Sequence, residues 1–256
     1  MEYSSPASPA PKVPSSAAQR DIPKEIVFEQ DELPASADEG AALLIDKPKG
    51  RTSFDVVKAL RKWMNVRKVG HAGTLDPMAT GLLIILVARP ATRLQEAFMH
   101  FPKAYEGTMR LGETTPSHDV ETDVQEQEDV SHLSREEIEQ ARTEFVGVID
   151  QVPPMYSAVK VEGERLYKKA RRGETVERPP RQVRVDAFEV LGWNAPELRF
   201  RVECSKGTYI RSLARDLGDA LGVGAHLTSL RRMAIGPYTV SDAWPLGSLQ
   251  AALNQT

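Results

Sequence analysis

Hydrophobic and polar positions alternate along some parts of this chain, and hydrophobic residues form contiguous runs in others. Residues 43–46, LLID, form a short and mostly apolar segment before a Lys-Pro-Lys-Gly turn, and residues 82–87 form a longer, branched apolar run without alternation. Both predict buried strands, because a strand covered on two faces is continuously apolar. Strict alternation at 105–111 and at 198–204 predicts two further strands that are buried on one face only.

Helical spacing marks three other segments. Thr52 or Ser53 supplies an N-cap for a helix whose apolar face continues to Met64. A Ser-x-x-Glu capping box at 134–137 precedes a second helix, and a leucine at every fourth position from 213 to 221 marks a third. Helices and strands thus mix without strict βαβ order, which favours an α+β domain with a mixed sheet over a doubly wound fold.

The first forty residues show no such period. The opening SSPASPAPKVPSSAAQ is rich in Ser, Pro and Ala, and this region holds 8 acids against 3 Lys or Arg. We therefore expect residues 1–40 to be disordered and the folded domain to span 41–256. The acids argue against an organellar transit peptide, and no cationic and apolar leader opens the chain.

Composition narrows the classes of function. The longest apolar run, 82–88, is too short to span a membrane, the single Cys204 fits a reducing cytoplasm, and five scattered histidines give no metal-ligand spacing. We expect a cytoplasmic protein without membrane contact or metal. The net charge of −3 conceals 9 bases against 4 acids at 160–184, so a nucleic-acid partner is to be sought in that local surface.

The stretch GHAGTLDPMATG, residues 70–81, holds one carboxylate between glycines and a proline. Pro77 biases Asp76 toward extended backbone, and the glycines allow a ligand to approach closely. Asp76 can then serve as a nucleophile or a general base, although Asp-Pro is also a common turn pair and a purely structural turn is an equal alternative on composition. Neither glycine-rich phosphate motif is present, so nucleotide binding is poorly supported.

GHAGTLDPMATG resembles the catalytic loop of the TruB family of tRNA pseudouridine synthases. Five more segments resemble motifs of that family in the same order: KPKG with RTS (47–53), AYEGTMRLGETTPSHD (104–119), VPPMYSAVKVEGERLYKKARRGE (152–174), CSKGTYIRSLARDLG (204–218) and AHLTSLRR (225–232). The resemblance covers about residues 41–245. It implies the pseudouridine synthase fold, a mixed sheet flanked by helices, with a basic RNA-binding insertion at about 152–180.

The resemblance also implies a reaction and a set of catalytic residues. Uridine 55 in the TΨC loop of tRNA is flipped out and isomerised to pseudouridine without cofactor or metal. Asp76 is the implied nucleophile, and Tyr105 stacks on the base and takes part in late proton removal from C5. Arg211 pairs with Asp76, and a cation there is expected to lower the pKa of the carboxyl group and keep it ionised.

Further residues are assigned to binding. The resemblance places Tyr209 and Leu230 in the uracil pocket and His71 against the RNA, with Lys47 as a support for the loop. By pattern alone, Tyr105 and Tyr209 are better explained as half-buried strand aromatics, and Leu230 as a core residue. In the insertion, the expected RNA-binding residues are Lys160, Arg165, Lys168, Lys169, Arg171 and Arg172.

Alternatives within and beyond the family stay open. Many TruB proteins carry a C-terminal PUA-type RNA-binding domain, which we expect this chain to lack. The related guide-RNA-dependent, dyskerin-type branch is a rival, but the insertion favours stand-alone recognition of tRNA by a monomer. A tRNA-folding chaperone would need the same binding surface, and we keep it as a secondary function.

Overall fold

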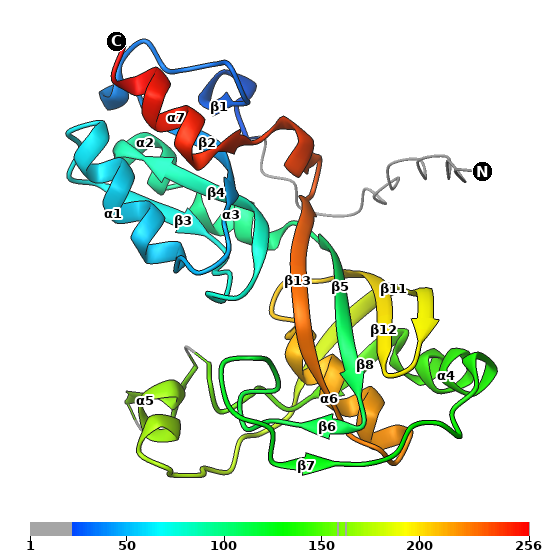
Figure 1. Cartoon of the computed structure of the whole chain (residues 1–256). Helices are drawn as coiled ribbons and strands as arrows, with labels where there is room; N and C mark the ends of the chain where they lie inside the picture. Colours follow the sequence, from blue (N-terminus) through cyan, green and yellow to red (C-terminus); the bar gives the residue numbers. More distant parts are fainter. Residues whose placement is uncertain (1–21, 158, 162, 256) are drawn as a thin grey trace, which may run out of the picture.

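The computed structural model describes residues 22–157, 159–161 and 163–255. Strands β5 (Lys103–Leu111) and β13 (Ala225–Ile235) join an upper and a lower half of the molecule (Figure 1). The upper half combines the early chain, coloured blue to cyan, with the last residues in red, and the lower half holds the middle of the chain. Since β5 and β13 pair antiparallel along their length, one sheet runs through both halves.

Within the described residues, eleven strands form this main sheet, and its central path runs β1-β2-β4-β13-β5-β12-β11-β8. Besides β5 and β13, they are β1 (Val27–Phe28), β2 (Ala41–Lys47), β3 (Val69–Ala72), β4 (Thr80–Val87), β8 (Gly147–Gln151), β11 (Arg181–Asn194), β12 (Glu197–Cys204), β14 (Tyr238–Thr239) and β15 (Trp244–Pro245). Two small hairpins are β6 (Glu113–Thr114) with β7 (Glu126–Gln127), and β9 (Lys160–Val161) with β10 (Glu164–Arg165). Parallel pairs β1/β2, β4/β13 and β2/β15 stand among antiparallel ones, so the expected mixed sheet of an α+β fold is confirmed.

Seven α-helices accompany the sheet in the described part of the chain. They are α1 (Ser53–Trp63), α2 (Ala88–Thr92), α3 (Gln95–His100), α4 (Arg135–Arg142), α5 (Leu166–Arg171), α6 (Ile210–Ala220) and α7 (Leu246–Leu253). The predicted N-caps are confirmed: Thr52 and Ser134 both accept from the backbone three residues on and both complete a capping box. These helices start where the sequence indicated because caps are local interactions.

The run LLIILV lies in β4, which is buried on both faces, as its unbroken apolar pattern predicted. Leu83, Ile85 and Val87 pack into the larger core, while Leu82 and Ile84 point into a second cluster on the other face. β4 is therefore a rigid support for the loop that precedes it.

The expectation that residues 1–40 are disordered is wrong for residues 22–40. A 3₁₀ turn (Lys24–Ile26) leads into β1, which pairs with Ala42 and Leu43 of β2. The Trp244 indole donates to the Glu32 carbonyl at 3.1 Å. The edge of β2 supplies hydrogen-bond partners for the backbone of β1. The composition of residues 22–40 gives no sign of this pairing. Residues 1–21 lie outside the described residues.

The glycine-rich stretch 70–81 is a shorter loop than its composition suggested. Residues 69–72 form β3, in which His71 pairs with Ile85, and β4 already begins at Thr80. Only residues 73–79 form the connection. Gly73 and Gly81 bound it, with φ angles of 87° and 99° that favour glycine.

Replacing Gly81 should destabilise the fold at the end of this loop. A Cβ there would lie 2.3 Å from the carbonyl oxygen of Arg232, on a backbone that L residues rarely adopt. We expect Gly81→Ala to lower the free energy of unfolding by about 3 kcal/mol or more, measured by urea denaturation. Gly147→Ala is the matched control, with a φ of 101° and no atom within 4 Å, and should cost only about 1 kcal/mol. Equal losses would contradict the close approach of β13.

Candidate active site

The loop that carries Asp76 is pinned on both sides of that residue. The Ser53 hydroxyl, at the start of α1, contacts the Leu75 N–H at 2.8 Å and the Leu75 carbonyl at 3.1 Å. The Gly50 N–H donates to the Pro77 carbonyl at 2.8 Å. With its backbone fixed in this way, Asp76 keeps a side chain that is 35% exposed. The carboxylate is thus both held in place and open to a reactant.

Lys47, the last residue of β2, supports the same loop. Its ammonium group is fully buried and donates to the carbonyls of Pro48, Arg51 and Pro77, at 3.0, 2.6 and 3.5 Å. Burial lowers the pKa of Lys47 to about 8. These three carbonyls give Lys47 a structural role between the turn after β2 and the loop of Asp76.

Arg211, near the start of α6, is the main partner of Asp76. Its Nε lies 2.9 Å from Asp76 Oδ2, and its Nη2 donates to Oδ1 at 3.3 Å. The guanidinium is only 4% exposed and also donates to the carbonyls of Ser117 and Tyr156, at 3.0 and 2.8 Å. These contacts fix its plane, so the pair with Asp76 has a defined geometry.

A second carboxylate, Asp119, lies on the other side of the guanidinium. It is fully buried, and its Oδ2 lies 3.6 Å from Arg211 Nη1. Asp119 Oδ1 accepts from the Ser117 hydroxyl at 2.5 Å and from the Glu121 N–H at 2.9 Å, which fixes its orientation. The sequence analysis did not single out Asp119, although it ends the motif AYEGTMRLGETTPSHD. Arg211 is therefore shared between one open and one buried carboxylate.

The pKa of Asp76 is raised above its ordinary value of 3.8. Burial is the largest cause, and the nearby charge of Asp119 adds to it, while Arg211 and Lys47 act in the opposite direction. The expectation that Arg211 keeps this pKa low is thus wrong in its net result. The reason is that loss of solvent around the loop outweighs the attraction of the cation. Such a shift is common for reactive carboxyl groups.

Tyr105 lies on β5, directly opposite Arg232 of β13, and the nearby cation partly offsets the effect of burial on the pKa of Tyr105. Arg232 is almost completely buried, and it donates to the carbonyls of Leu82 and Gly73 at 2.7 and 3.1 Å. It therefore links the strand beside Tyr105 to the first residue of the Asp76 loop. Burial raises the pKa of Tyr105, so the phenol stays protonated. Sequence reasoning missed Arg232, because an arginine in a strand carries no sign of such a contact.

Besides Tyr105, the three residues assigned to substrate binding lie on different elements. His71 on β3 is half-buried; burial and Arg232 lower the pKa of its imidazole. Tyr209, the N-cap of α6, is clamped by the Gln151 side chain, which contacts its N–H at 2.7 Å and its carbonyl at 3.1 Å. Leu230 belongs to the same core as Tyr105. For Leu230, core packing and a place in a pocket wall are compatible.

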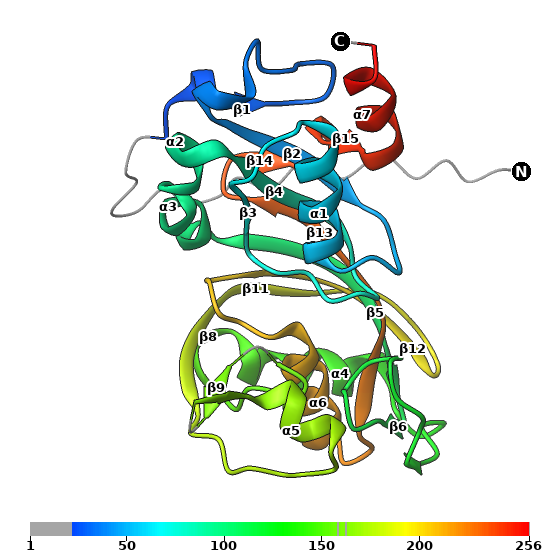
Figure 2. The same cartoon turned by 90° about the vertical axis from the view of Figure 1, so that its left-hand side faces the viewer.

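The basic insertion lies on the same side of the molecule as α1 and reaches the site through its backbone (Figure 2). Lys168 and Arg171 are exposed, and the Arg171 guanidinium lies 5.7 Å from the centre of the Tyr167 ring. Arg172 instead contacts Glu164 and Glu174, with its closest nitrogens at 2.8 and 2.6 Å. The side chains of Lys160 and Arg165 lie outside the described residues, and Lys169 is half-buried.

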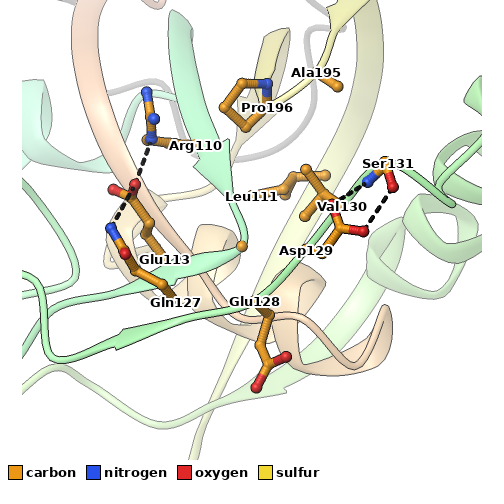
Figure 3. Close-up of a pocket in the computed structure, with 11 residues that line it drawn as sticks. Arg110, Leu111, Glu113, Gln127, Glu128, Asp129, Val130, Ser131, Ala195 and Pro196 are labelled. Carbon is orange, nitrogen blue, oxygen red and sulfur yellow. Dashed lines mark hydrogen bonds and ion pairs between the residues drawn. The ribbon is translucent and has the colours of Figure 1, made fainter.

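A separate hollow of about 410 Å³ lies at the far end of β5 (Figure 3). Its lining includes Glu113, Glu128 and Asp129, with Arg110 already paired to Glu113 at 2.9 Å. This acidic lining would repel phosphate, and none of its residues contacts Asp76 or Arg211. The hollow is not part of the candidate active site.

Over the described ranges, no helix is both long and apolar enough to cross a membrane. In the same part of the chain, no group of three or more His, Cys, Asp or Glu side chains is arranged to hold a metal ion.

Known proteins are similar in sequence to this chain over most of its length. Residues 61–210 match the model of the N-terminal domain of TruB family pseudouridylate synthase, and residues 211–256 match that of the C-terminal domain of tRNA pseudouridylate synthase B. A tRNA pseudouridine synthase B from Opitutus terrae is 47% identical over 209 residues, which cover 82% of this chain and 86% of the relative. The one from Thermobifida fusca is 49% identical over 217 residues, 82% and 74% of the two chains. The chain belongs to the TruB family.

Solved structures agree with this fold. A chain of a Cbf5-Nop10-Gar1 complex has a TM-score of 0.66 and 32% identity over 90% of this chain. A chain of the archaeal box H/ACA sRNP Nop10-Cbf5 complex has a TM-score of 0.64 and 28% identity over 91%. This chain spans about 60% of the length of each. The border between the two matched TruB domains, at residues 210–211, falls within α6. Strands from both matched ranges belong to the one main sheet.

Titration of the Asp76 carboxyl group tests the electrostatics of this TruB site. We expect its pKa, followed by ¹³C NMR, to lie above 3.8, because burial disfavours the charged form. Asp119→Asn should lower that pKa, since a neighbouring negative charge is removed. The carboxylate of Asp76 would then persist to lower pH than in the unsubstituted protein.

Asp129→Asn is the matched control for this titration. Asp129 is an exposed aspartate whose carboxylate accepts hydrogen bonds from the N–H and the hydroxyl of Ser131. It forms no hydrogen bond or ion pair with Arg211. It should leave the Asp76 titration unchanged. An Asp76 pKa below 3.8, or an upward shift in Asp119→Asn, would contradict the arrangement described here.

Proposed function

We propose that this chain is a stand-alone tRNA pseudouridine synthase that isomerises uridine 55 in the TΨC loop to pseudouridine. The observation that carries the proposal is the Asp76 carboxylate, open to a reactant yet held 2.9 Å from a buried arginine, in a chain of the TruB family. The relatives that are 45–50% identical are named for activity on tRNA. A cytoplasmic location and a monomeric state fit this function and stay predictions.

The reaction is an isomerisation in which atoms only change places. The bond from ribose C1′ to uracil N1 breaks, the base turns, and a bond from C1′ to C5 forms. The proton on C5 is then lost, and N1 gains one. Asp76 can start this sequence by attacking C1′ or by removing the 2′-proton, and its raised pKa makes the ionised carboxylate a stronger base.

Tyr105 suits the role of a stacking partner for the uracil. It stands on a strand opposite Arg232, which contacts the loop of Asp76, and burial keeps its hydroxyl protonated in the resting site. A protonated phenol cannot take the C5 proton directly, so its part in that late step stays a prediction. A folded tRNA must also expose its uridine, at a cost of roughly a few kcal/mol that contacts with phosphate would offset.

Two other functions of the same surface are less well supported. The Cbf5 chains with similar structures come from complexes that include other proteins, whereas the relatives named above carry the name tRNA pseudouridine synthase B. A tRNA-folding chaperone would bind the same RNA without needing the pair of Asp76 and Arg211. Both are separated from the proposed function by the experiment that follows.

Removing the carboxylate tests the proposed function directly. Unmodified tRNA transcript is incubated with the protein, and pseudouridine is mapped at single-nucleotide resolution. We expect product at position 55, and a loss of at least about 10³-fold in rate for Asp76→Asn, because an amide can act neither as a nucleophile at C1′ nor as a base for the 2′-proton. RNA binding should persist in this variant.

The remaining outcomes decide between the alternatives. Asp129→Asn is the matched control and should retain full activity. Refolding of the tRNA without product would overturn the synthase proposal and support a chaperone. Product that forms only with an added guide RNA would support the guide-dependent branch.

Salt dependence of binding tests the insertion. Lys168→Gln with Arg171→Gln should flatten the plot of log Kd against log salt by about 1.4–1.8, or about 0.7–0.9 for each lost phosphate contact. We choose these two residues because they are exposed, whereas Arg172 is held by acids. Lys24→Gln with Arg199→Gln removes the same charge at two exposed positions, before β1 and on β12, and should leave the slope unchanged. Equal slopes for both double variants would remove α5 from the interface.

A further inference from the structure

The most strongly basic stretch of the chain lies outside the insertion. Residues 49–68 hold seven Lys or Arg and one acid, in a chain whose net charge is −3. All seven are exposed: Lys49, Arg51, Lys58, Arg61, Lys62, Arg67 and Lys68. The one acid, Asp55, is already engaged with Thr52 in the capping box. A solvated helix face usually mixes the two signs of charge, and this one does not.

The cations of α1 are arranged with an aromatic ring on one face of the helix. Phe54, Lys58, Arg61 and Lys62 follow the spacing i, i+4, i+7, i+8, while Val56, Val57 and Leu60 face the core. The Phe54 side chain is 51% exposed, with Lys58 Nζ and Arg61 Cζ at 4.8 and 5.8 Å from the centre of its ring. Exposed rings between cations are typical of surfaces that bind single-stranded nucleic acid.

Partners within the protein account for little of this charge. Lys58 lies 3.9 Å from Asp55, and Arg61 donates to the Val69 carbonyl at 2.9 Å. Over the described residues, no hydrogen bond or ion pair engages the charged groups of Arg51 or Lys62. The face is therefore available to an external anion.

This face is attached directly to the candidate active site. Ser53, the residue before Phe54, holds the backbone of Leu75, which is the residue before Asp76. In Figures 1 and 2, α1 and α5 lie on the same side of the molecule, α1 in the upper half and α5 in the lower. An RNA whose uridine reaches Asp76 would thus pass between two basic helices.

We propose that the exposed face of α1, formed by Phe54, Lys58, Arg61 and Lys62, is a second RNA-binding surface. It holds the sugar-phosphate backbone of the tRNA in the upper half of the molecule while α5 holds it in the lower, and Phe54 stacks on an unpaired base. The inference rests on the proposed function, since it takes tRNA as the substrate at Asp76. Charge complementarity favours a polyanion, and the exposed Phe54 ring between the cations favours one with exposed bases.

Two exposed lysines allow a test of the charge. Lys58→Gln with Lys62→Gln is compared with the unsubstituted protein and with Lys24→Gln plus Arg199→Gln, all binding unmodified tRNA transcript over a series of salt concentrations. We expect the slope of log Kd against log salt to flatten by about 1.4–1.8 in the α1 variant only. The rate of isomerisation at saturating tRNA should stay unchanged, because Asp76 and Arg211 are intact.

Phe54→Ala tests stacking separately. It should weaken binding about fivefold or more at every salt concentration without changing the slope, because stacking releases no counterions. Leu191→Ala is the matched control, since Leu191 is 43% exposed on β11, and should not change the affinity.

The two proposals fail in different ways. If the unsubstituted protein forms pseudouridine but the α1 double variant keeps its slope, the α1 surface is overturned and the proposed function stands. If the unsubstituted protein forms no pseudouridine in tRNA, the proposed function is overturned. An α1 face that prefers an acidic protein or anionic vesicles over tRNA would likewise overturn this inference.

Discussion

The site depends on one buried guanidinium. A cation with 4% of its surface exposed is costly to bury unless carboxylates and hydrogen-bond acceptors surround it. Arg211 meets this condition with Asp76, Asp119 and two backbone carbonyls, which belong to segments far apart in the chain. The network that neutralises this charge therefore also brings together the Asp76 loop, the turn before Asp119, the start of the insertion and α6.

Within that network, the two carboxylates differ because of their surroundings. Asp119 is enclosed and hydrogen-bonded, so it serves as a fixed counter-charge. Asp76 is partly open, and burial of the loop raises its pKa although Arg211 is adjacent. Rigidity of the backbone around Asp76, from Ser53, Gly50 and Lys47, then leaves the reactive group oriented but accessible. Such preorganisation is what a reaction at a flipped nucleotide requires.

Charge is distributed along the chain in a way that suits a folded RNA. The net charge of −3 gives no sign of it, since the acids lie mainly in the N-terminal region and the segment after β5. The bases gather at α1 and at α5, which lie on one side of the molecule. The acidic hollow near Arg110 is lined instead by the end of β5, by β6 and β7 and by the turn between β11 and β12, without residues of α1 or α5 (Figure 3). Electrostatic attraction would thus orient a tRNA toward Asp76 before close contacts form.

Local patterns in the sequence determined the strands and the capped helices. Motifs that resemble those of the TruB family singled out Asp76 and Arg211 as candidate site residues. These are short-range signals, since caps and alternation depend on residues a few positions apart. Only the tertiary structure decided that Asp119 shares Arg211, that Arg232, opposite Tyr105, donates to Gly73, which is 159 residues away in the sequence, and that Arg172 is held by acids. It also showed that residues 22–40 are ordered and that the pKa of Asp76 rises. Contacts and desolvation of this kind depend on which distant segments pack together, and no local pattern encodes them.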